Sequence, residues 1–155
     1  MKIRYLLVSF LFACSLALAG EPDLERLQKI AGQGDPASQY ELGMAYYEGK
    51  GVSQDFKGAV KWFQKAADQK NSQAQFQLGE CFFYGKGVPL NHEEAVRWYR
   101  QGAEQGNPKA QGRLGNRFVW GEGVPSNLEE ALKWFRLGAE QGDAYSQGGL
   151  GWCYS

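Results

Sequence analysis

The sequence has no excess of charge of either sign, and this excludes the electrostatic signature of a nucleic-acid-binding domain. Its 155 residues include 17 Lys and Arg against 17 Asp and Glu, which gives a formal net charge of zero. A domain that binds DNA or RNA is expected to carry a basic patch or stripe. We therefore predict no nucleic-acid partner. A hydrophobic content of 43% is enough for the core of one folded domain.

Residues that commonly perform catalysis are few and scattered. The only histidine, His92, directly follows the helix-capping residue Asn91, where its side chain is expected to be solvated. Two pairs of adjacent glutamates, at 93–94 and 129–130, stand at predicted helix starts, where carboxylates favour the helix dipole. The motifs G-x-S-x-G, H-E-x-x-H and C-x-x-C are absent. The sequence therefore predicts that the protein is not an enzyme and has no catalytic residue, metal site or cofactor.

A long apolar run occurs only at the N-terminus. Residues 5–18 are almost entirely apolar, follow Lys2 and Arg4, and precede the small residue Ala19. The run is shorter than the roughly 20 residues that a membrane span requires. We predict a signal peptide over residues 1–19, cleaved after Ala19, a periplasmic or secreted protein, and no stable membrane insertion after cleavage. The alternative is a lipoprotein signal, because the residues before Cys14 loosely resemble a lipobox.

Glycine, in contrast, is abundant, and most of the 21 glycines follow an internal repeat of 36 residues. No insertion or deletion interrupts this period. The recurring blocks are a capping segment at 34–39, 70–75, 106–111 and 142–147, a Leu-Gly pair at 42, 78, 114 and 150, a Gly-x-Gly-Val loop at 49, 85 and 121, and an Ala-x-x-Trp-aromatic block at 59, 95 and 131. A fixed period of this length is typical of a solenoid.

Each unit has the pattern of a helix, a glycine loop and a second helix. The first helix is preceded by a capping residue at 35, 71, 107 and 143, and the second by one at 55, 91 and 127. The loop glycines are expected to adopt positive φ. In the second helix, an i, i+3, i+4, i+7, i+8 pattern predicts a buried stripe of Ala95, Trp98, Tyr99, Gly102 and Ala103.

These motifs resemble the Sel-one-like repeat (SLR) family, a relative of the tetratricopeptide repeats. The resemblance covers residues 34–155 and implies an all-α fold, an α/α solenoid of helix-loop-helix repeats that usually serves as a scaffold for protein partners. We expect an N-terminal capping half-helix at 20–33, complete repeats at 34–69, 70–105 and 106–141, and a partial repeat at 142–155 that has only its first helix. Either the natural chain is truncated at this point, or this apolar edge meets another protein.

Cys81 and Cys153 occupy the same phase of the repeat, two repeats apart. Helix packing distances place them roughly 20 Å apart, too far for a disulfide, so we predict free thiols. The resemblance adds that some exported members of the family pair two cysteines within each repeat and are linked to β-lactam binding or hydrolysis. This sequence lacks the second cysteine of each pair. A cell-wall or β-lactam-acting enzyme is therefore the alternative hypothesis, and a scaffold that acts mainly by assembling is a third.

The face of the first helix that is predicted to be exposed varies between repeats, which makes it the candidate partner-binding surface. Trp62, Trp98 and Trp134 recur at 36-residue intervals and are predicted to be core, whereas Trp120 stands where other repeats have Glu or Tyr. In related solenoids the first helix lines the concave surface. We predict that a protein or peptide partner binds there, on Glu41, Met44, Glu48, Gln77, Glu80, Tyr84, Lys109, Arg113, Asn116 and Trp120.

One further repeat position changes from aromatic to glycine along the chain. Tyr40 and Phe76 hold a ring there, whereas Gly112 and Gly148 hold none. Each glycine costs roughly 0.8–1 kcal/mol of helix propensity relative to alanine and forgoes the burial of a ring. The third and fourth first helices are therefore predicted to open before the first two.

Overall fold

The computed structural model describes residues 21–154, which form eight α-helices and no strand. Helix α2 (Glu21–Gly32) comes first, and α9 (Ala144–Cys153) comes last. Between them lie the pairs α3 (Pro36–Glu48) and α4 (Phe56–Asp68), α5 (Ser72–Tyr84) and α6 (His92–Glu104), and α7 (Pro108–Trp120) and α8 (Leu128–Glu140). The predicted α/α solenoid is confirmed. The predicted signal peptide, with Cys14, lies outside the described residues.

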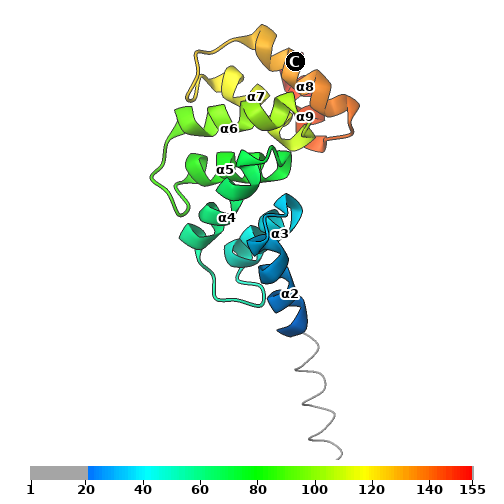
Figure 1. The fold of residues 1–155 in the computed structure, drawn as a ribbon. Helices are drawn as coiled ribbons and strands as arrows, with labels where there is room; N and C mark the ends of the chain where they lie inside the picture. Colours follow the sequence, from blue (N-terminus) through cyan, green and yellow to red (C-terminus); the bar gives the residue numbers. More distant parts are fainter. Residues whose placement is uncertain (1–20, 155) are drawn as a thin grey trace, which may run out of the picture.

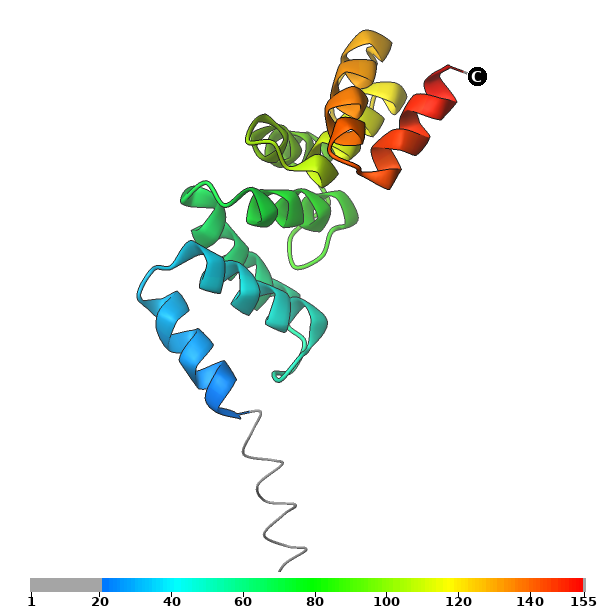
Figure 2. The same ribbon diagram turned by 90° about the vertical axis from the view of Figure 1, so that its right-hand side faces the viewer.

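The helices stack one after another into an elongated, curved body, with α2 at one end and α9 beside α8 at the other (Figures 1 and 2). We call α3, α5, α7 and α9 the first helices, and α4, α6 and α8 the second helices. Each second helix packs against the first helix before it and the first helix after it, and α9 contacts both α7 and α8. Stability in such an array comes from contacts between neighbours.

Side-chain caps begin the first helices as the sequence predicts. The carboxylate of Asp35 accepts a hydrogen bond from the N–H of Ser38 at 2.7 Å, and the equivalent bond from Ser146 to Asp143 measures 2.8 Å. Asn71 and Asn107 cap α5 and α7 in the same way. Each cap satisfies one of the N–H groups that a helix start leaves without an intrahelical partner.

In α6 and α8, only half of a capping box forms, and before α4 the predicted capping residue Asp55 accepts no side-chain capping bond. The side chain of Asn91 accepts a hydrogen bond from the N–H of Glu94 at 3.1 Å. The N–H of Asn91 itself donates to the carbonyl of Phe82 at 2.9 Å, and the Glu94 carboxylate pairs with Arg97 at 2.8 Å. Because the preceding helix already satisfies the N–H of Asn91, the glutamate bonds along its own helix.

The glycine loops adopt positive φ and join neighbouring repeats. Gly85 and Gly87, between α5 and α6, have φ values of 67° and 75°. A Cβ atom on Gly87 would lie 2.3 Å from the carbonyl oxygen of Phe56, and one on Gly123 would lie 2.2 Å from that of His92. Gly87 and Gly123 therefore let their loops rest on the start of the second helix in the preceding repeat, whereas a Cβ atom on Gly51 in the first loop would meet nothing within 4 Å.

The core follows the predicted stripe of the second helices. All five residues of the predicted stripe in α6 are buried: Ala95, Trp98, Tyr99, Gly102 and Ala103. Trp134 is also buried in α8, whereas Trp62 in α4 is only half-buried. The prediction of core tryptophans therefore holds fully for two of the three repeats.

Candidate partner-binding surface

The ten residues predicted to bind a partner lie on the first helices, and we call them together the first-helix surface. Three hollows open along these helices. Seven of the ten residues line them: Glu41, Met44, Glu48, Lys109, Arg113, Asn116 and Trp120. The structure therefore brings most of the predicted residues to concave parts of the molecule.

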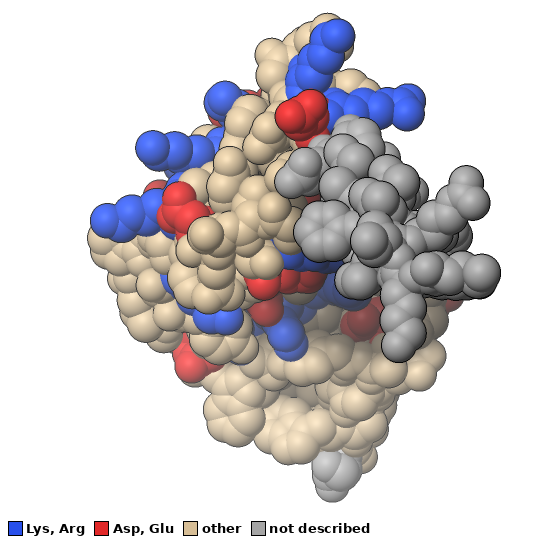
Figure 3. Space-filling view, turned by 90° about the horizontal axis from the view of Figure 1, so that it is seen from below, with Lys and Arg blue, Asp and Glu red and all other residues tan. Residues whose placement is uncertain are grey.

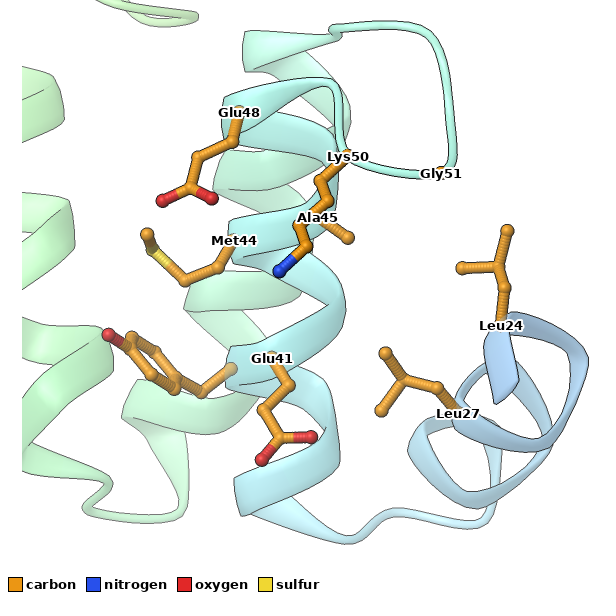
Figure 4. Close-up of a pocket in the computed structure, with 9 residues that line it drawn as sticks. Leu24, Leu27, Glu41, Met44, Ala45, Glu48, Lys50 and Gly51 are labelled. Atoms are coloured by element: carbon orange, nitrogen blue, oxygen red, sulfur yellow. The ribbon is translucent and has the colours of Figure 1, made fainter. Parts of the chain in front are cut away.

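The first hollow lies between α2 and α3 and has a volume of about 480 Å³. Leu24 and Leu27 extend from α2 toward α3, while Met44 and Glu48 project from α3 (Figure 4). Glu41 also lines it, and both of its glutamates are exposed. None of the described residues forms a salt bridge with either carboxylate. Lys50, which is also exposed, lines the same hollow, so its apolar floor is edged by two carboxylates and one ammonium group.

The second hollow, of about 430 Å³, lies between α7 and α9. Trp120 and Trp152 line it, with their ring centroids 5.5 Å apart, and Phe135 of α8 lies at the same hollow. The side chain of Trp120 is 62% exposed. A large aromatic side chain that is exposed beside an apolar hollow is suited to anchor a partner.

The third hollow, of about 250 Å³, is lined by Lys109 and Arg113 of α7 and by Tyr145 of α9, which also lines the second hollow. The Tyr145 ring lies beside Gly112, where the sequence analysis expected a missing ring to leave empty space. A Cβ atom on Gly112 would lie 3.1 Å from the Tyr145 ring and 2.7 Å from the hydroxyl of Ser146. Helix α9 therefore packs directly on Gly112, so the space that the missing ring was expected to leave is filled. The order in which the first helices open stays a prediction.

Glu80 and Arg113 form an ion pair between α5 and α7. The guanidinium Nε of Arg113 lies 3.0 Å from Oε1 of Glu80, and the hydroxyl of Tyr99 donates to the same oxygen at 2.6 Å. Burial alone would lower the pKa of Arg113, but the hydrogen bond and charge of Glu80 raise it above the ordinary value. Burial and the same carboxylate raise the pKa of Tyr99. The pair therefore braces adjacent repeats as well as lining the surface.

The remaining predicted residues differ in exposure. Tyr84 is exposed at the end of α5 and packs edge-on against Phe83, whereas Gln77 is half-buried. Because Glu80 neutralises Arg113, the unpaired charge lies at the ends of the surface, acidic on α3 and basic at Lys109. Figure 3 views the molecule from the α2 end, where acidic and basic side chains lie interspersed.

Sequence reasoning missed the contributions of α9 and α2 to these hollows. Tyr145 and Trp152 follow Lys109 and Asn116 by one repeat period, so continuing the predicted stripe by 36 residues would have found both. Leu27 lies one period before Phe63, so the repeat places α2 in the phase of a second helix, but it does not indicate that Leu24 and Leu27 line a hollow.

The described residues offer no arrangement typical of a catalytic or metal centre. Burial raises the pKa of the Cys81 thiol to about 12, so this sulfur stays protonated at neutral pH. Cys81 and Cys153 are both free, as predicted. Between residues 21 and 154, no group of three or more His, Cys, Asp or Glu side chains is placed to hold a metal ion. In the same range, no helix is both long enough and apolar enough to cross a membrane.

The fold is that of a helical repeat solenoid. Three consecutive stretches, residues 36–71, 72–107 and 108–143, match the Sel1 repeat. The chain belongs to the Sel1 repeat family, as its motifs suggested, and these repeats typically mediate protein–protein interaction.

Solved structures agree with this assignment. The chain is 40% identical to c5321, a protective antigen present in uropathogenic Escherichia coli strains that displays an SLR fold, with a TM-score of 0.77 over 80% of this chain and 27% of that chain. It is 34% identical to a Sel1 repeat protein from Oxalobacter formigenes, with a TM-score of 0.81 over 87% of this chain and 55% of that chain. The chain thus spans only part of both relatives. No curated protein matches it.

A more distant structure shares the fold alone. Cysteine rich protein B of Helicobacter pylori is 17% identical, with a TM-score of 0.68 over 81% of this chain and 93% of that chain.

Proposed function

We propose that this Sel1-repeat protein is exported to the bacterial envelope, where it binds a protein or peptide on its first-helix surface without catalysing a reaction. One observation supports the binding part of the proposal: seven of the ten first-helix surface residues, which vary between otherwise regular repeats, line the hollows. Variation at fixed structural positions is expected where a scaffold recognises its partner.

The chemistry of the hollows specifies the partner. The α3 end presents exposed Glu41 and Glu48 and one lysine, Lys50, around apolar side chains, and its excess of negative charge favours a segment with a basic residue next to an apolar one. The α7–α9 end presents Trp120 and Trp152, which favour an aromatic or large aliphatic side chain. A partner that spans both ends therefore needs basic and apolar anchors in a fixed order.

Site-specific photo-crosslinking tests this proposal in cells. A photoreactive residue replaces Trp120 or Glu48 on the first-helix surface, and in the control it replaces Lys57, which is exposed on α4. We expect one partner to crosslink from the first two positions and not from the third. Purified Trp120→Ala should then bind that partner at least about fivefold more weakly. Equal crosslinking from Lys57 would contradict the assignment of the surface.

The export step is tested separately by mass spectrometry of protein from the periplasm and the medium. We expect a mature chain that begins at Gly20. A lipid on Cys14 would support the lipoprotein alternative, and an intact first residue in the exported protein would contradict cleavage after Ala19.

A further inference from the structure

Neighbouring first helices are joined by different side chains in successive repeats. We call the surface between α5 and α7 the α5–α7 seam, and the surface between α7 and α9 the α7–α9 seam. In the α5–α7 seam, Glu80 and Arg113 satisfy each other: Nε and Nη2 of Arg113 lie 3.0 and 3.4 Å from the two carboxylate oxygens of Glu80. The hydroxyl of Tyr99 donates to the same carboxylate at 2.6 Å. This seam is therefore closed by groups of the chain itself.

The α7–α9 seam has no such pair. The equivalent positions, one repeat period later, hold Asn116, Gly149 and Phe135. None of these three residues is charged, and only Asn116 has a side chain that forms hydrogen bonds. All three line the second hollow, of about 430 Å³. A hollow in the α7–α9 seam thus replaces the ion pair of the α5–α7 seam.

Asn116 presents a hydrogen-bond donor to this hollow. Its side-chain oxygen accepts a hydrogen bond from Nη2 of Arg117, which leaves the NH₂ group to bond an occupant. Arg117 is itself held in place, because its Nη1 lies 2.7 Å from Glu122 and its guanidinium carbon lies 4.0 Å from the centroid of the Phe83 ring. The indole N–H of Trp120, in the same hollow, can also only donate. A matching segment therefore supplies acceptors.

The third hollow adds a positive charge to the same seam, and Tyr145 lines both hollows. Lys109 is exposed there, and no carboxylate between residues 21 and 154 forms a salt bridge with it. Asp143 lines the third hollow too, but its Oδ2 already accepts two hydrogen bonds at the start of α9, at 2.8 and 2.6 Å, and the helix dipole offsets its charge. Arg113 is paired within the α5–α7 seam. Lys109 is therefore the charge that a partner can pair with.

The first-helix surface is also open in the interior of the array. Tyr84 lies one period before Trp120 and is 54% exposed, although α6 to α9 follow it along the chain. Trp120 is exposed to a similar extent, 62%. The exposure of Trp120 is therefore a property of this side of the solenoid and not of the last complete repeat.

We propose that the α7–α9 seam binds a peptide segment of a partner protein in which an acidic residue and an aromatic residue stand three positions apart. The aromatic ring packs against Trp120 in the second hollow, a carbonyl of the segment accepts from Asn116, and the acidic side chain pairs with Lys109. Asn116 follows Lys109 by seven residues on α7, which corresponds to about 10 Å along the helix. An extended chain covers this distance in about three residues. The inference rests on the proposed function and adds the carboxylate, which that function does not require.

Isothermal titration calorimetry with an unlabelled peptide tests the proposal. The peptide Phe-Ser-Ser-Glu-Ser-Ser-Phe, acetylated and amidated at its ends, has one carboxylate and places a ring three positions away on either side, so its direction along the seam does not matter. We expect saturable binding to the purified chain. Replacing Glu by Gln in the peptide should weaken binding about two- to fivefold, as for an exposed ion pair. Replacing both Phe residues by Ala should weaken it at least about fivefold.

Protein variants show whether the peptide lies in the seam. Lys109→Gln should weaken binding of the Glu peptide about two- to fivefold, and the Glu and Gln peptides should then bind this variant equally. Lys57→Gln changes an exposed lysine of α4 and is the matched control, which should bind both peptides as the unmodified chain does. Trp120→Ala should weaken binding of both peptides at least about fivefold.

Three results would overturn the proposal: no saturable binding, equal binding of the Glu and Gln peptides by the unmodified chain, or a difference between them that persists in Lys109→Gln. None of these results decides the proposed function, which depends on photo-crosslinking of a natural partner from Trp120 and Glu48. Equal crosslinking from Lys57 would contradict the proposed function even if the peptide binds in the seam.

Discussion

Gly112→Ala and Gly148→Ala are chemically identical changes at equivalent positions of the repeat, and we expect opposite effects on stability. Both replace glycine within a helix, so helix propensity alone favours alanine by roughly 0.8–1 kcal/mol at each site. At Gly148 the new methyl group meets nothing within 4 Å. We therefore expect Gly148→Ala to stabilise α9 by up to about 1 kcal/mol.

At Gly112 the same methyl group enters the contact between α7 and α9. It would lie 2.7 Å from Oγ of Ser146 and 3.0 Å from Oδ2 of Asp143. These two atoms are 2.6 Å apart in a hydrogen bond, and Asp143 also caps α9, so neither is free to move away. Overpacking of this kind costs about 1–3 kcal/mol. The propensity gain offsets part of this cost, which leaves a net loss of up to about 2 kcal/mol.

Thermal unfolding followed by circular dichroism measures both changes, and amide hydrogen exchange in α9 shows whether they act locally. Each kcal/mol corresponds to roughly 3–5 °C in Tm for a chain of this size. We expect Tm to rise for Gly148→Ala and to fall for Gly112→Ala, with faster exchange in α9 for the latter. If Gly112→Ala stabilised the protein as much as Gly148→Ala does, the inference that α9 packs closely on Gly112 would be refuted.

Three further predictions concern the core, the ion pair and the buried thiol. Trp98→Ala should destabilise the protein by about 3–5 kcal/mol in urea titrations, because it empties a buried site. An equal loss for Trp120→Ala would contradict our assignment of Trp120 to the exposed first-helix surface. Arg113→Ala should cost about 1–2 kcal/mol by leaving the Glu80 carboxylate poorly solvated, and Glu80→Gln in the same chain should recover part of that loss; additive losses would argue against the pair. Burial raises the pKa of Cys81 from 9.0 to about 12, so the stability that the neutral thiol contributes is complete below pH 9 and is lost as pH rises toward 12. In urea titrations, the unfolding free energy of Cys81→Ala should therefore decline less steeply over that range than that of the unmodified chain. An equally steep decline would exclude the thiol as the cause of the pH dependence.

The features that the sequence predicted depend on residues that are close together in the chain. The capping residue Asn71, the loop glycine Gly85 and the stripe around Trp98 each act within one or two helical turns, so a 36-residue repeat of their pattern is enough to place the helices. The pattern also predicted that Trp120 is exposed, because an aromatic residue occurs at that position in only two of the three complete repeats.

The sequence by itself thus determined the period, the helix pairs and the stripe of variable residues on the first helices. Only the tertiary structure decided how those residues are used, because it brings together side chains that the repeat keeps apart. Glu80 and Arg113 are 33 residues apart and meet because α5 and α7 lie in adjacent repeats. Gly112 lowers the helix propensity of α7, but it also allows α9 to pack closely, since Tyr145 and Ser146 occupy the space next to its Cα atom. Packing between repeats, which no local pattern records, determines whether a surface residue braces the solenoid or faces a partner.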